Sequence, residues 1–163
     1  MATPRTGSEN RLEIRRTFAA PREKVFAAWT QREGLEKWMC RDVPTHEPKY
    51  KELDVRMGGR YVIEIPIANE GFTYRGYGIF REVKPPEKLV FTWAWEKVRA
   101  GKGEPEQLDE GESLVTVELI ARGKSTEMIF THEGFGNAKI RDEHQKGWDG
   151  CFEVLDKYLK GQR

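Results

Sequence analysis

The sequence predicts an α+β fold in which a curved antiparallel sheet of about six to seven strands wraps round one long C-terminal helix. Two observations carry this prediction. Apolar residues recur at three- and four-residue spacing over residues 138–160, which indicates a helix with one apolar face. Apolar and polar residues alternate over most of the chain before it, which indicates half-buried strands. Such a helix must bury its apolar face on the sheet.

Taken from the N-terminus, residues 1–9 are polar and predict a flexible tail, and residues 10–163 predict a single domain of this fold. Residues 10–18 alternate and form the first predicted strand. Two short helices then follow, one beginning near Pro21, which suits a first helical turn, and one over residues 32–39. Their apolar residues are expected to be buried: Val25, Phe26, Trp29, Leu35, Trp38 and Met39.

Turn residues divide the middle of the chain into strands that follow one another as an antiparallel meander. Gly76 and Gly78 lie inside one of them and indicate a bend or a close approach of another backbone. Residues 98–111 are rich in glycine and charge and predict a mobile hairpin loop. The predicted strands cover residues 43–51 (an edge strand, because of two prolines), 60–66, 72–84, 88–96, 114–120 and 126–132.

The long C-terminal helix has a well-defined apolar face and a natural end. Gly161 follows it as a stop signal. A curled sheet that grips one helix is a helix-grip arrangement. The main apolar residues of that face are Ile140, Trp148, Phe152, Leu155 and Leu159, with Cys151 and Tyr158 at its margins.

Composition excludes several classes of function. The 163 residues carry a net charge of +1, which gives no argument for a nucleic-acid partner. No apolar run approaches the ~20 residues that span a bilayer, and the N-terminus lacks the apolar core of a secretory signal, so we expect a cytoplasmic protein. Cys40 and Cys151 suit that compartment as reduced thiols, with a disulfide between them as the alternative.

Several segments, taken together and in order, resemble one protein family. Their similarity is to the Aha-type branch of the SRPBCC, or START-like, superfamily, the relatives of the activator of the heat-shock protein ninety ATPase. The resemblance implies a helix-grip fold with a cavity between sheet and long helix, of the kind that binds lipids, sterols or polyketides in wider relatives. The segments are RTFAAPREKVFAAWT, GGRY, YRGYG, EVKPPEKLVFTW, THEGF and HQKGWDGCFEVLDKYL.

The candidate binding site is the set of aromatic and other large residues on the faces that should meet. Dry core packing is the alternative interpretation, because aromatic residues also stabilise small domains without a ligand. His132 would be either a polar anchor in the pocket or a hydrogen-bonded core histidine. The predicted ligand contacts are Trp38, Tyr74, Trp93, Trp95, Met128, Phe130, His132, Trp148 and Phe152.

Motifs for other chemistry do not occur in the sequence. It contains no HExxH, HxxxH or CxxC spacing for zinc and no glycine-rich nucleotide motif, and neither cysteine lies in a catalytic signature. The prediction therefore includes no catalytic residue, no metal and no cofactor.

The function predicted is binding of a small hydrophobic or amphipathic molecule, lipid- or polyketide-like, in an internal cavity. One alternative is a cyclase or hydrolase for such a ligand, with His132 as general acid or base. Another is a module that contacts a chaperone and stimulates its ATPase. The expected partners are thus a small hydrophobic molecule or a chaperone, without nucleic acid or a membrane span, and the chain would be a monomer or a homodimer.

Overall fold

The computed structural model describes residues 11–99 and 103–161, and its sheet has seven strands in the order β1-β7-β6-β5-β4-β3-β2. The strands are β1 (Arg11–Phe18), β2 (Lys49–Leu53), β3 (Arg60–Ile67), β4 (Phe72–Lys84), β5 (Lys88–Arg99), β6 (Glu106–Arg122) and β7 (Ser125–Glu133). The helices are α1 (Arg22–Thr30), α2 (Arg32–Trp38) and α3 (Ala138–Leu159), with a short 3-10 turn, η2, at Ala68–Glu70.

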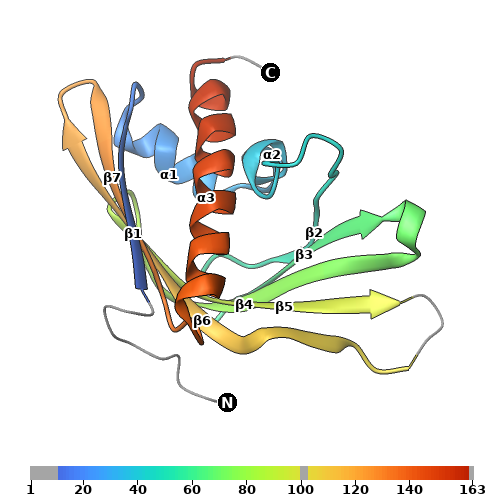
Figure 1. Ribbon diagram of the computed structural model, residues 1–163. Coiled ribbons are helices and arrows are strands. Elements are labelled where there is room, and N and C mark those ends of the chain that lie inside the picture. The colour runs from blue at the N-terminus through green and yellow to red at the C-terminus, as the bar shows by residue number, and fades with distance from the viewer. Residues whose placement is uncertain (1–10, 100–102, 162–163) are drawn as a thin grey trace.

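The sheet is an antiparallel meander from β2 to β7, and β1 returns to pair with β7. It curves round α3, while α1 and α2 lie beside the C-terminal half of that helix (Figure 1). This arrangement confirms the predicted α+β helix-grip fold, with both short helices after the first strand.

Helix α3 begins and ends where the sequence predicted. The Asn137 side chain caps its first turn by accepting a hydrogen bond from the Ile140 amide at 2.9 Å. Gly161 follows the helix with a φ of 79°, a left-handed conformation that glycine adopts without strain. The residues buried against the sheet are Trp148, Cys151, Phe152, Leu155 and Leu159.

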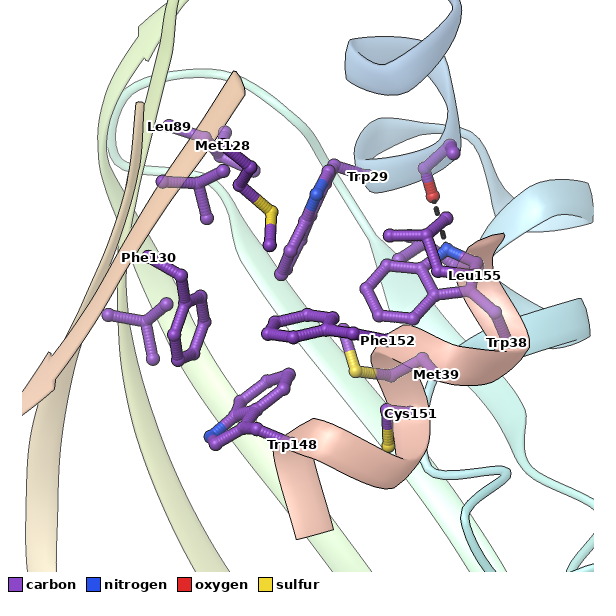
Figure 2. Packing of buried hydrophobic residues seen from close by; sticks show 14 of the residues in the cluster. Trp29, Trp38, Met39, Leu89, Met128, Phe130, Trp148, Cys151, Phe152 and Leu155 are labelled. Atoms are coloured by element: carbon purple, nitrogen blue, oxygen red, sulfur yellow. Dashed lines mark hydrogen bonds between the residues drawn. The ribbon is translucent and has the colours of Figure 1, made fainter. Parts of the chain in front are cut away.

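Aromatic side chains fill the space between the sheet and the C-terminal half of α3 (Figure 2). Trp29 of α1 lies at the centre of this cluster, with its ring 4.7 Å from that of Trp38, 6.1 Å from Phe130 and 6.1 Å from Phe152. Trp38 donates its indole hydrogen bond to the Ala28 carbonyl at 2.8 Å. The gap that remains beside Trp29 holds about 10 Å³, room for one water molecule at most.

The glycines inside β4 allow close packing, as predicted. A Cβ on Gly78 would lie 2.0 Å from the carbonyl oxygen of Thr92 and 2.7 Å from the ring of Tyr61. The Tyr61 hydroxyl donates a 2.5 Å hydrogen bond to that same carbonyl. Because Gly78 has no side chain, the Tyr61 ring can lie over β4, and its hydroxyl can connect β3 to β5.

Two strand predictions were wrong in part. The edge strand starts at Lys49 rather than near residue 43, since the segment with the prolines forms turns before it. The predicted loop over 98–111 is largely strand, because β5 runs on to Arg99 and β6 already starts at Glu106. Pairing with a neighbouring strand satisfies the backbone there, and it overrides a composition that favours loops.

Some predictions concern residues that the structure does not describe. The predicted tail, residues 1–9, lies outside the described residues, as do residue 10 of the first predicted strand and residues 100–102 of the predicted loop. Within the described part of the chain, no helix is long and apolar enough to cross a membrane.

Candidate functional site

A pocket of about 230 Å³ opens where the N-terminal half of α3 meets strand β5 and the segment that follows α2. Its walls are mostly apolar, and carboxylates and a histidine also line it. The lining residues are Met39, Cys40, Asp42, Trp93, Trp95, Glu143, His144, Gly147, Trp148 and Cys151.

Strand β5 supplies two of the indole rings. Trp93 and Trp95 lie two residues apart on one face of the strand, with ring centroids 5.4 Å apart. Trp95 covers Gly76 of β4, where a Cβ would lie 3.2 Å from its ring. The opposite strand bulges at this point: Trp93 pairs with Ser113 but Trp95 pairs with Leu108. Bulges of this kind redirect side chains next to binding sites.

Helix α3 supplies the third indole ring, Trp148, and makes room for the loop after α2. A Cβ on Gly150 would lie 2.7 Å from the Cβ of Asp42, and a Cβ on Gly147 would lie 3.7 Å from a carboxylate oxygen of Asp42. Glycine inside a helix costs about 1 kcal/mol relative to alanine. In return it lets the loop that carries Asp42 approach the helix backbone.

Cys40 and Cys151 are free, buried thiols at the floor of the pocket. The Cys151 thiol lies 3.6 Å from a carboxylate oxygen of Asp42 and donates to it. Burial, followed by the negative charge of Asp42, raises the pKa of Cys151 to about 12. Burial raises the pKa of Cys40 well above its ordinary value as well. Both groups are therefore neutral thiols at physiological pH, and neither is an activated nucleophile. No disulfide joins these two cysteines in this structure.

A chain of hydrogen bonds fixes His132 behind the pocket wall. The indole of Trp148 donates to Nδ1 of His132 at 3.0 Å, so in the neutral ring Nε2 carries the proton. Nε2 lies 2.6 Å from the hydroxyl of Ser113, which donates in turn to the carbonyl of Trp93 at 3.1 Å. The chain thus links Trp93 and Trp148, two of the three tryptophans that line the pocket.

His132 is fully buried, and it is not among the residues that line the pocket. Burial, and after it the neighbouring His144, lower the pKa of His132 well below its ordinary value. The ring is therefore neutral at physiological pH, with both of its nitrogens in hydrogen bonds. In this arrangement the residue orients Trp148.

The structure brings together only part of the predicted contact set. Trp93, Trp95 and Trp148 line the pocket. Tyr74 lies next to it, with its ring 6.4 Å from that of Trp95. The other predicted contacts, besides His132, have no exposed surface and belong to the packed cluster: Trp38, Met128, Phe130 and Phe152.

Sequence reasoning did not assign the other lining residues to a site. Asp42 lies in a loop, and Glu143 is an exposed residue on the polar face of α3, so neither follows an apolar period. The one available signal was the pair of glycines, Gly147 and Gly150, inside a helix. Isolated glycines in a helical pattern often have a packing or functional reason. Among residues 11–99 and 103–161, no group of three or more metal-ligating side chains could hold a metal ion.

A curved antiparallel sheet that grips a long C-terminal helix, with a pocket at one end of their interface, defines a protein of the START-like, helix-grip class. Within that class, the chain belongs to the family described as Activator of Hsp90 ATPase homolog 1-like protein, whose model matches residues 19–160. No curated protein matches the chain.

Solved structures of bacterial proteins share this fold. Protein CV1439 from Chromobacterium violaceum is 22% identical with a TM-score of 0.75, and the match covers 91% of this chain and 96% of that one. A protein from Arthrobacter aurescens is 22% identical with a TM-score of 0.76, over 94% and 87% of the two chains. The AHSA1 protein from Silicibacter pomeroyi is 24% identical with a TM-score of 0.73, over 92% and 97%.

Proposed function

We propose that the protein binds a small, largely apolar or amphipathic molecule in the pocket between α3 and β5. The observation that supports this most directly is the set of three indole rings, Trp93, Trp95 and Trp148, round a pocket that the aromatic cluster leaves open. Ligand sites are typically concave and apolar, with a few polar groups that orient the ligand. The family belongs to a fold class whose members bind such molecules.

The size of the pocket limits what it can hold. Its volume of about 230 Å³ is below the ~300–1,000 Å³ of sites that enclose a drug-sized ligand. The pocket would therefore take one ring or head group, and the rest of the ligand would lie outside it. Trp95 and Tyr74 continue the aromatic surface along the sheet from the pocket, and they would contact this remainder.

A buried donor adds a polar element to the proposed site. The indole N–H of Trp93 is buried and has no hydrogen-bond partner among the described residues. Trp93 forms the wall between the pocket and the small gap beside Trp29. Since an unpaired buried donor is costly, a water molecule or an acceptor atom of the ligand would stabilise the site.

Titration calorimetry with a panel of small amphipathic compounds tests the proposal, with tryptophan fluorescence as a second signal. We expect binding that Trp95→Leu weakens by about tenfold or more, because that side chain lines the pocket and is partly exposed there. Trp38→Phe is the matched control, since Trp38 lies in the packed cluster and away from the pocket. The proposal fails if no compound binds, or if both variants change the affinity equally.

A second candidate rests on the family description, which names activation of the Hsp90 ATPase. An interaction of this kind would use the outer surface rather than the pocket. Measuring the ATPase rate of a purified chaperone with the protein and with its Trp95→Leu variant separates the two candidates. Equal stimulation by both proteins would favour the chaperone function, and no stimulation would exclude it for that chaperone.

A further inference from the structure

Two carboxylates and the imidazole of His144 are, besides the two thiols, the ionisable side chains among the described residues that line the pocket. Asp42 and Glu143 are exposed at its mouth, and no lysine or arginine among the described residues lines it. Neither carboxylate forms an ion pair within the part of the chain that the structure describes. Arg41, next to Asp42, donates to the backbone carbonyls of Glu36 and His46, and Arg141, two residues before Glu143, forms an ion pair with Asp142. The two carboxylates that line the mouth therefore favour a cation there.

The walls of the same pocket are aromatic. The rings of Trp93 and Trp148 lie 5.1 Å apart, and Trp95 stands almost perpendicular to Trp93 at an interplanar angle of 84°. Tryptophan faces attract cations more strongly than those of any other side chain, and cages of aromatic rings are used to recognise quaternary ammonium groups. Rings that meet at such angles present both faces and edges to one small volume.

Further along the sheet, the protein itself uses this interaction. The Lys97 ammonium lies 4.4 Å from the ring centroid of Phe72 and 6.0 Å from that of Tyr74. Tyr74 in turn contacts Trp95. One end of this aromatic surface is thus covered by a cation of the chain, whereas the other end, in the pocket, is lined by two carboxylates and, among the described residues, by no lysine or arginine.

From this combination we infer that the pocket recognises a weakly hydrated organic cation, of the quaternary ammonium class, as the polar group of its ligand. The inference rests on the proposed function and specifies the class of ligand. A primary ammonium has three N–H donors that all need acceptors, and the pocket offers carboxylates only at its mouth. A trimethylammonium group has no hydrogen-bond donors and presents methyl groups to the indole rings. It therefore loses less hydration free energy than a primary ammonium when it leaves water.

A pair of ligands with the same shape and different charge tests the inference. Benzyltrimethylammonium and neopentylbenzene differ by one nitrogen in place of one carbon. Calorimetric titration should show at least about fivefold tighter binding of the cation. This preference should decrease at high ionic strength, because the carboxylates at the mouth are exposed and become screened.

Substitutions at the mouth of the pocket then test which residues cause the preference for the cation. Glu143→Gln and Asp42→Asn should each weaken binding of benzyltrimethylammonium several-fold and leave the affinity for neopentylbenzene unchanged. Glu118→Gln, an exposed position on β6, changes the net charge by the same amount and should change neither affinity. An effect of Glu118→Gln as large as that of Glu143→Gln would overturn the assignment to the pocket.

The outcomes distinguish the inference from the proposed function. Equal binding of the two compounds, or tighter binding of the neutral one, overturns the cation preference and leaves the proposed function standing. If neither compound binds while members of the amphipathic panel do, the inference alone fails. If nothing in either set binds, both fail.

The same trimethylammonium chemistry occurs in free small molecules and in lipid head groups. Sedimentation with vesicles of phosphatidylcholine, compared with vesicles of phosphatidylglycerol, separates these sources. Retention on phosphatidylcholine alone, abolished by Trp95→Leu, supports a lipid head group as the ligand. No retention, together with calorimetric binding of benzyltrimethylammonium, supports a soluble ligand. Retention on phosphatidylglycerol alone contradicts the inference, because an acidic mouth should repel that surface.

Discussion

The two halves of helix α3 face the same curved sheet, but they meet different surroundings. In the C-terminal half, Phe152, Leu155 and Leu159 are buried against rings from α1 and α2. In the N-terminal half, His144 and Trp148 line an open pocket. Figure 1 shows the reason: α1 and α2 lie beside the C-terminal half only. The two halves are thus distinguished by which elements cover them.

Removing a large side chain from the closed half should have the largest effect. Phe152→Ala is expected to lower the free energy of unfolding by about 3–5 kcal/mol, because Phe152 has no exposed surface and its neighbours cannot fill the cavity. Trp95→Leu, at the open half, should cost less than about 2 kcal/mol. Denaturant unfolding measures both. Equal losses would show that the two halves are packed alike.

The hydrogen-bond chain through His132, behind the wall of the pocket, predicts a dependence of stability on pH. Since the folded-state pKa of His132 lies well below its unfolded value, protonation favours the unfolded chain. The contribution of the neutral His132 ring to the free energy of unfolding is fully present above about pH 6.5, and it is lost as the pH falls below that value. The free energy of unfolding should decrease with a slope approaching about 1.4 kcal/mol per pH unit.

Unfolding curves recorded between pH 5 and 7 measure this slope, because His132 is the fully buried histidine among the described residues. His132→Gln should remove this contribution, whatever its effect on the absolute stability. His46→Gln, in the loop after α2, should leave it in place. A slope that survives in His132→Gln would assign the pH dependence to another group.

The two glycines at the boundary with the pocket should respond in opposite directions to the same substitution. Gly147→Ala adds a methyl at 3.7 Å from Asp42 and should stabilise the helix by up to about 1 kcal/mol. Gly150→Ala places a methyl 2.7 Å from the Asp42 side chain, so overpacking should outweigh that gain and give a net loss of about 1 kcal/mol. Thermal unfolding compares them. A gain in both variants would show that the loop after α2 moves away freely.

Thiol labelling should give the smallest effect, since it tests access without changing stability. With the pKa of Cys151 raised to about 12, and that of Cys40 also raised, the folded protein should not react with an aromatic disulfide reagent at pH 8. After unfolding, both cysteines should react. Single variants, Cys40→Ser and Cys151→Ser, assign the signal. Rapid labelling of the folded chain would show that the pocket opens far wider than the structure indicates.

Much of the fold could be predicted from the sequence because burial follows local periods. Trp148, Phe152, Leu155 and Leu159 of the predicted face of α3 are buried, and Ile140 is partly buried. Strand β4 was predicted with its observed bounds, Phe72–Lys84. The prediction of a loop over residues 98–111 was wrong in part for a physical reason. A charged, glycine-rich segment can form a strand when a neighbouring strand pairs with it, and this pairing does not depend on the local sequence alone. The bulge that places Ser113 opposite Trp93 depends on the same pairing.

The site was predictable only in part. An alternating pattern identifies Trp93 and Trp95 as facing the helix, but it does not tell them apart from Phe130, which is packed in the core. Asp42 and Glu143 follow no apolar period. They line the pocket because the loop after α2 packs against the N-terminal half of α3. This contact depends on the tertiary structure.

The sequence by itself determined the elements, the faces that they bury and the family to which they belong, because residue spacing fixes which side chains share a face. The tertiary structure alone decided where the interior is full and where it is open. That decision depends on Trp29, which α1 carries into the closed half, whereas no described residue of α1 or α2 lines the pocket beside Trp148. The filled part and the open part of the interior both result from the packing of elements that are distant in sequence, and no local sequence pattern predicts that packing.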